Sequence, residues 1–114
     1  MKTLRALTLA LLAAGSLSLS QAQGLRPEVG KPLQQASELL KAGKGREALA
    51  KVREAEAVGG KTAAEQLTID RMKGAAAQRA GDNSAAVDAF ESVFPKVSGA
   101  EQRQVAESLA FAYS

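Results

Sequence analysis

The 114-residue sequence contains no histidine and no cysteine. These absences remove imidazole general bases, thiolate nucleophiles and nearly all zinc or copper sites from the chemistry that the chain offers. They also remove a disulfide framework, although an oxidising compartment is still permitted. We therefore expect a protein that is not an enzyme and that holds no metal or other cofactor.

Aromatic residues are also scarce. Tryptophan is absent, and the aromatic side chains are Phe90, Phe94, Phe111 and Tyr113. A core must therefore be built mainly from Ala, Leu and Val. Alanine is the best helix former, and no stretch of useful length alternates apolar and polar residues as a half-buried strand does. We expect a single all-α domain.

The first 22 residues have the three-part layout of a secretory signal peptide. A short cationic start (1–5) precedes a run of mostly Ala and Leu (6–19), and small residues follow at the positions that a signal peptidase inspects (20–22). The alternative is a membrane span, which needs roughly 20 apolar residues; this run has 14 residues, four of them Gly, Ser or Thr. We expect cleavage after Ala22, no stable membrane anchor afterwards, and a periplasmic or secreted protein.

Most of the net positive charge belongs to this targeting segment. The whole chain carries 15 basic and 12 acidic residues, a net charge of +3. Lys2 and Arg5 leave with the signal peptide, so residues 23–114 hold 13 basic and 12 acidic residues. A net charge of +1 creates no field that attracts nucleic acid or an anionic membrane. We expect neither as a partner.

Glycine, proline and capping residues divide the mature chain into five expected helices. Residues 23–30 form a leader segment, in which Pro27, like Pro32 after it, suits the first turn of a helix. Capping boxes at Thr62–Glu65 and Ser98–Glu101 predict two of the helix starts. Apolar spacing of three and four residues predicts the helices themselves, within residues 32–43, 45–59, 62–81, 82–95 and 98–114.

Two segments of the mature chain resemble each other at a period of 38 residues. Residues 42–52 align with residues 80–90, and each has Ala-Gly, three turn residues, a spacer, and then Ala followed by an aliphatic residue. This period is typical of helical solenoids, in which each unit is a helix, a tight turn and a second helix. We expect Ala48 and Ala86 to lie where paired helices cross too closely for a larger side chain.

With these residues the sequence resembles the tetratricopeptide repeat (TPR) family. The matching positions are Ala36, Leu39, Gly43, Ala48, Val52 and Ala55 in the first unit, and Gly74, Ala77, Gly81, Ala86, Phe90 and Val93 in the second. Residues 109–113 match the Leu-small-any-Ala-Tyr signature in the first helix of a third unit. The resemblance covers residues 31–114. It implies antiparallel helix-turn-helix units at 31–60 and 66–97, with a half unit at 99–114, stacked as a short right-handed solenoid.

The sequence departs from the family pattern at several positions. Pro32 and Asp70 stand where the family has an aromatic residue, and Gly60 and Ser98 replace a proline near the end of each unit. The spacing also exceeds the usual repeat of about 34 residues. Because of these departures we expect irregular or divergent repeats. The alternative is a plain five-helix bundle.

The resemblance implies a non-catalytic scaffold that binds a protein or peptide segment on a concave face formed by the first helix of each unit. Carried over position by position, the groove candidates are Ser37, Leu40, Lys41, Arg71, Ala75, Gln78, Arg79, Glu107 and Phe111. Arg71 and Arg79 are eight residues apart, about two helical turns. Both could meet an acidic side chain or a C-terminal carboxylate; the alternative is that both simply face solvent.

The remaining charged and glycine motifs favour ordinary roles. Glu54 and Glu56 point in different directions on a helix, and Asp88 and Glu91 share a face without a converging partner. We expect all four to be solvated. The turn at 43–45 lacks the length and the Lys-Ser/Thr ending of a phosphate-binding loop.

The third unit has a first helix but no second, and the helical pattern runs to Ser114 without a stop signal. Solenoids need about three repeats and a polar capping helix. We therefore expect an N-terminal portion of a longer repeat protein or a truncated reading frame. A second hypothesis is a self-associating structural module whose unfinished unit pairs with another copy. An enzyme would require a buried carboxylate pair with perturbed pKa values in a pocket.

Overall fold

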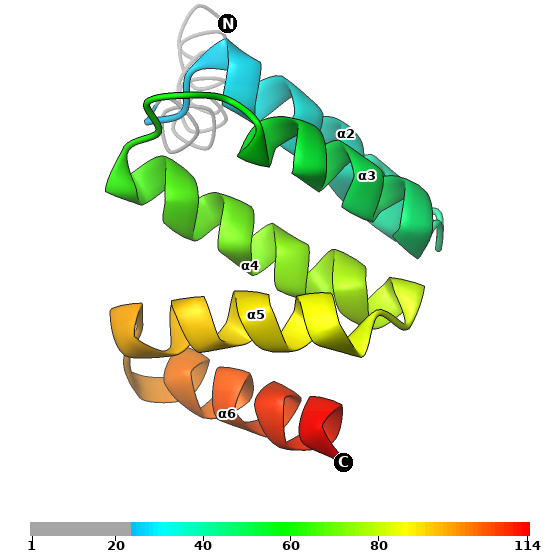
Figure 1. Cartoon of the computed structure of the whole chain (residues 1–114), viewed down its shortest axis with the longest axis vertical. Coiled ribbons are helices and arrows are strands. Elements are labelled where there is room, and N and C mark those ends of the chain that lie inside the picture. Colours follow the sequence, from blue (N-terminus) through cyan, green and yellow to red (C-terminus); the bar gives the residue numbers. More distant parts are fainter. Residues whose placement is uncertain (1–23) are drawn as a thin grey trace, which may run out of the picture.

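The computed structural model describes residues 24–114, and over these residues the chain is all-α, as expected (Figure 1). The expected signal peptide at residues 1–22 lies outside the described residues. The elements are α2 (Pro27–Lys41), α3 (Gly45–Glu56), α4 (Ala63–Ala80), α5 (Asn83–Val93), the 3-10 turn η1 (Phe94–Lys96) and α6 (Gly99–Tyr113). None of these helices has both the length and the apolar character that crossing a membrane requires.

Successive helices run in opposite directions and lie side by side, so the order along the chain is also the order along the stack (Figure 1). Each helix packs on the next, and α2 also contacts α4. An ion pair between Arg71 and Glu101 links α4 directly to α6. Contacts are therefore made between alternate helices (α2 with α4, and α4 with α6) as well as between successive ones. Hollows can form between these alternate helices.

The core is built largely from small side chains, as the composition predicts. Ala48 and Ala86 are 0% and 1% exposed, so both are buried in the core, as a position between packed helices requires. Protein interiors are close-packed, so a larger side chain at such a position typically costs about 1–3 kcal/mol. The buried apolar residues with at most 1% exposure are Val29, Ala36, Ala48, Val52, Ala55, Ile69, Ala76, Ala77, Ala86 and Val93.

Two glycines mark the closest approaches between helices. A Cβ atom on Gly45 would lie 2.5 Å from the carbonyl carbon of Arg79 and 2.6 Å from the nitrogen of Ala80. A Cβ atom on Gly74 would overlap the ring of Phe90. Glycine is therefore required where α3 begins against the end of α4, and where α5 crosses α4.

Several helix ends form as predicted. The Thr62–Glu65 capping box makes both of its bonds: the Glu65 amide donates to Thr62 Oγ1 over 3.0 Å, and the Thr62 amide donates to Glu65 Oε1 over 2.9 Å. The Asp82 carboxylate accepts from the amide of Ala85 at the start of α5. Gly81 ends α4 with φ +75°, a left-handed conformation that favours glycine.

The expected leader segment at 23–30 is wrong. The first helix begins at Pro27, one turn earlier than predicted, and Val29 is fully buried. The apolar stripe extends back from Leu33 to Val29 at a spacing of four, and Pro27 supplies the preset backbone of a first helical position. Pro32 lies inside the helix near its start, where it removes a single backbone hydrogen bond.

The second capping box is also wrong. Ser98 precedes α6, but its side chain makes no capping bond. The Glu101 carboxylate binds the guanidinium of Arg71 instead, with Arg71 Nε 2.6 Å from Oε2 and Nη2 2.9 Å from Oε1. Both carboxylate oxygens of Glu101 are therefore bound to a tertiary partner instead of to the start of their own helix.

Candidate binding grooves between alternate helices

Two hollows lie between alternate helices. The α2/α4 groove has a volume of about 540 Å³ and is lined by Leu25, Pro27, Gly30, Lys31, Leu33, Gln34, Ser37, Thr68 and Met72. The α4/α6 groove has a volume of about 210 Å³ and is lined by Arg71, Ala75, Gln78, Phe90, Val93, Glu101, Gln104, Val105 and Ser108. Ligand sites in proteins are typically concave and mostly apolar, with a few polar groups that orient the ligand.

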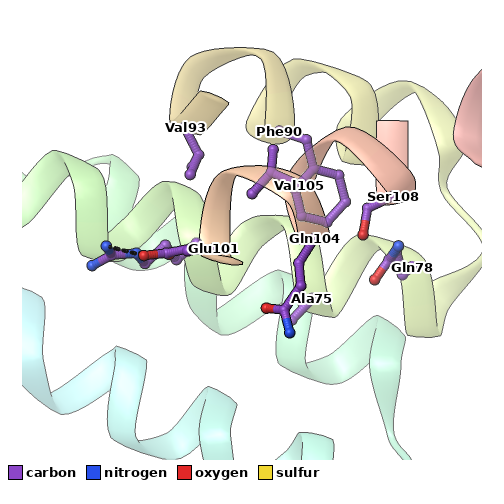
Figure 2. A pocket seen from close by; sticks show the side chains of 9 residues that line it. Ala75, Gln78, Phe90, Val93, Glu101, Gln104, Val105 and Ser108 are labelled. Atoms are coloured by element: carbon purple, nitrogen blue, oxygen red, sulfur yellow. Dashed lines mark hydrogen bonds and ion pairs between the residues drawn. The ribbon is translucent and has the colours of Figure 1, made fainter. Parts of the chain in front are cut away.

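The α4/α6 groove has an apolar floor and a polar rim that includes the Arg71–Glu101 ion pair (Figure 2). Its floor includes Phe90, Val93 and Val105, all buried in the core. Figure 2 shows Glu101, with its dashed bonds to the neighbouring arginine, at one end of the groove and Gln78 and Ser108 at the other. Because its volume is small, this groove fits a single side chain rather than a whole small-molecule ligand.

The α2/α4 groove is larger and more apolar. Leu33 is buried at its floor, and Leu25 and Met72 pack against the core from either side. Thr68 already donates its hydroxyl to the carbonyl of Ala64 over 3.0 Å. Lys31 is the one ionisable residue among those that line this groove. The groove is therefore an apolar hollow with a single cation at its edge.

The sequence-predicted groove residues divide between these hollows and other places. Ser37 lines the α2/α4 groove. Arg71, Ala75 and Gln78 line the α4/α6 groove together. The other predicted residues line neither of the two: Leu40, Lys41, Arg79, Glu107 and Phe111. Four of the nine predicted residues are thus found at the two grooves.

The two arginines that were expected to share a groove are separated. Arg79 lines a different hollow beside the turn at 43–47, whereas Arg71 faces the α4/α6 groove and binds Glu101. The side chains of this pair are 45% and 41% exposed. An exposed pair contributes only about 0.2–1 kcal/mol, so a ligand carboxylate can compete for Arg71 at small cost.

Sequence reasoning missed the most heavily bonded polar cluster, which joins Arg26 to Glu65. The Glu65 carboxylate is fully buried. Its Oε2 accepts from the amide and Nε of Arg26 at 2.9 and 3.1 Å, and its Oε1 accepts from Nη2 of Arg26 at 3.1 Å and from the amide of Thr62. These hydrogen bonds, above all those from Arg26, lower the pKa of Glu65 from 4.5 to about 2. The capping box signals Glu65, but no sequence signal identifies an arginine 39 residues away.

A second buried acid, Asp70, is also held by hydrogen bonds inside the protein. Its carboxylate accepts from Nε2 of Gln66 at 3.0 Å and from the hydroxyl of Ser92 at 2.7 Å. The bond to Ser92 joins α4 to α5. Neither Asp70 nor Glu65 lines a groove, and both have internal partners. Across residues 24–114, no group of three or more acidic side chains lies close enough together to hold a metal ion.

No family model matches the chain, and neither the curated proteins nor the solved structures contain a match. A functional assignment therefore depends on the chain's own geometry. The features that bear on it are two grooves between alternate helices, one apolar with a lysine and one with an ion pair at its end. Both are lined mainly by α2, α4 and α6 rather than by the helices between them.

Proposed function

We propose that this protein is an exported, non-catalytic module that binds a peptide or protein segment along α2, α4 and α6. The observation that carries the proposal is the pair of grooves between these alternate helices. A partner segment that places one side chain in each groove would use both of them.

A TPR-like, right-handed solenoid is the architecture that we propose for this module. In its favour, α2–α3 and α4–α5 are antiparallel pairs with the same kind of turn (Figure 1). Gly43 and Gly81, which are 38 residues apart, follow the two first helices with φ values of +78° and +75°. The equivalent residues Ala48 and Ala86 are both buried. Two units with the same turn and a buried alanine at the same position are what a repeat predicts.

The non-catalytic part of the proposal is supported by the chemistry of the grooves. Histidine and cysteine are missing from the sequence. Glu101 is the one acid among the residues that line the two grooves, and Arg71 already binds it. A lone, exposed and neutralised carboxylate offers no acid–base pair.

Binding can be tested by selecting peptides from a displayed random library with the purified protein and measuring their affinity by fluorescence polarisation. Ala75→Arg places a long side chain in the α4/α6 groove, and we expect it to weaken binding at least tenfold, about 1.4 kcal/mol. Ala50→Arg is the matched control, because Ala50 is exposed on α3 and lines neither groove. Equal affinity of the Ala75→Arg variant and the parent protein, or no enrichment of any peptide, would count against the proposal.

Export is tested separately. The mass of the protein recovered from a bacterial periplasmic fraction should correspond to residues 23–114, because the signal peptide is expected to be cut after Ala22. Recovery of the full-length mass from the cytoplasmic fraction alone would contradict export and leave the binding proposal to be judged by the peptide experiment.

The second candidate is a self-associating structural module. It is favoured by α6, on which Phe111 and Tyr113 are 75% and 63% exposed. Exposed aromatic side chains are frequent at protein interfaces. Light scattering across a concentration series distinguishes the two candidates: a dimer that dissociates in the Phe111→Ser variant supports self-association, and a monomer at all concentrations argues against it.

A further inference from the structure

Gly30 is a glycine that the fold does not require. It lies within α2, where glycine is the poorest helix former apart from proline. Its φ is not positive, and a Cβ atom placed on it would make only ordinary contact, 3.7 Å from Cβ of Leu25. Gly45 and Gly74 differ, because a Cβ atom at either position would collide with its neighbours. Gly30 therefore weakens the helix without relieving any steric conflict.

The missing side chain at Gly30 also leaves space in the α2/α4 groove. Gly30 is one of the residues that line this groove, together with Leu25 and Leu33. A residue that breaks a local rule without a structural reason is often a functional one. The groove's volume of about 540 Å³ lies within the range typical of ligand-binding pockets.

The charge around the groove selects among occupants. No acid lines it, and Lys31 stands at its edge. Among residues 24–114, the ion pairs involve Arg26, Lys51, Arg53, Arg71 and Lys73, so Lys31 has no carboxylate within ion-pair distance there. A cationic occupant would face Lys31 with no compensating charge. An occupant with a carboxylate next to its apolar group complements both features.

We infer that the α2/α4 groove holds a bulky apolar side chain of a partner segment, and that Lys31 pairs with an acidic residue beside it in that segment. This inference rests on the proposed function and specifies its ligand: an extended peptide with a leucine-like anchor flanked by Asp or Glu. The apolar anchor supplies most of the affinity because it leaves water, and the exposed ion pair supplies mainly the preference for acidic over basic neighbours.

Three heptapeptides test the inference by titration into the isotopically labelled protein, followed by NMR. They are acetylated Gly-Ser-Asp-Leu-Asp-Ser-Gly, the same peptide with Lys in place of both Asp, and the same peptide with Ser in place of Leu. We expect the Asp-Leu-Asp peptide to bind at least tenfold more tightly than either other peptide, and to shift the amide signals of Gly30, Leu33 and Met72 most.

Two variants complete the test. Gly30→Leu fills the groove and improves the helix, so we expect normal folding with at least a tenfold loss of affinity, whereas Gly30→Ala keeps most of the space and most of the affinity. Lys31→Glu should reverse the preference, so that the Lys-Leu-Lys peptide binds better. Arg103→Glu is the control for charge, because Arg103 is exposed on α6 away from both grooves.

The outcomes separate this inference from the proposed function. If library-selected peptides bind and respond to Ala75→Arg but not to Gly30→Leu, the inference is overturned and the proposed function stands. Equal affinities for the Asp-Leu-Asp and Lys-Leu-Lys peptides would also overturn the inference. If neither the heptapeptides nor any selected peptide binds, both fail together.

Discussion

Helices α4 and α6 begin with the same kind of motif and end up with different structures. Thr62–Glu65 and Ser98–Glu101 both read as capping boxes, and only the first forms. In both, the glutamate is captured by a distant arginine: Glu65 by Arg26 and Glu101 by Arg71. The two motifs differ in whether the glutamate, once bound to the arginine, also accepts a hydrogen bond from the amide of its N-cap residue.

The position of each arginine explains the difference. Arg26 binds Glu65 while leaving Oε1 within 2.9 Å of the Thr62 amide, so the carboxylate serves the arginine and the helix start together. Glu101 turns both oxygens toward Arg71 on α4, and it makes no bond to the Ser98 amide. A capping motif therefore predicts a helix start in both cases, but a bonded cap only where the tertiary partner approaches from a compatible direction.

Replacing Glu65 should produce the largest effect. Each Glu65 oxygen accepts from two N–H donors, so the amide nitrogen of Glu65→Gln would face two donors in either orientation. Glu65 is fully buried, although the side chain of Arg26 is 41% exposed, and leaving buried hydrogen-bond donors without an acceptor is destabilising. We expect the thermal midpoint to fall on the order of 10 °C, measured by circular dichroism. A fall of about 2 °C or less would mean that this cluster is dispensable.

Acid should weaken the contribution of Glu65 to stability. A carboxyl whose pKa is lower in the folded than in the unfolded state contributes stability that is fully present above the unfolded pKa and is lost as the pH falls toward the folded one. For Glu65 that window runs from about 4.5 down to about 2. Urea titrations at a series of pH values should show the parent protein losing stability across this window. The Glu65→Gln variant should lose less, and parallel curves for the two proteins would refute the assignment.

The next largest difference in stability is expected between replacements of the two N-cap residues, Thr62 and Ser98. Thr62→Ala removes a hydroxyl that accepts from the Glu65 amide, and loss of such a cap costs about 1 kcal/mol. Ser98→Ala removes a side chain that makes no capping bond, so its effect should stay within about 0.5 kcal/mol. Urea unfolding of the two variants measures both values. Equal losses would mean that Ser98 caps α6 in solution.

Much of the fold is predictable from the sequence because it depends on local signals. Gly81 ends a helix because a left-handed residue is needed there, and Asp82 starts the next because its carboxylate accepts a free amide. The burial of Ala48 and Ala86 follows from their place in the repeated pattern. The start of α2 was missed because Pro32 offered an equally good first position, and only the burial of Val29 distinguishes Pro27.

The candidate grooves are less predictable because they depend on distances between helices. The resemblance to TPR proteins suggested Ala75 and Gln78, which do share a groove. It did not suggest Leu25 or Met72, which meet only when α2 and α4 lie together. The same limit applies to Arg71, whose partner lies 30 residues away and replaces the ligand carboxylate that the sequence suggested.

Replacing Glu101 should have a small effect on stability and a measurable effect on binding. The exposed Arg71–Glu101 pair is worth about 0.2–1 kcal/mol and is weakened by salt, so Glu101→Gln should lower stability by no more than that, and by less in 0.5 M salt. The variant leaves Arg71 without its carboxylate at the end of the α4/α6 groove, so peptides with an acidic residue should bind more tightly, by about two- to fivefold. Fluorescence polarisation measures this gain, with Glu107→Gln as the control for the lost charge. An unchanged affinity would mean that Arg71 orders α6 and takes no part in recognition.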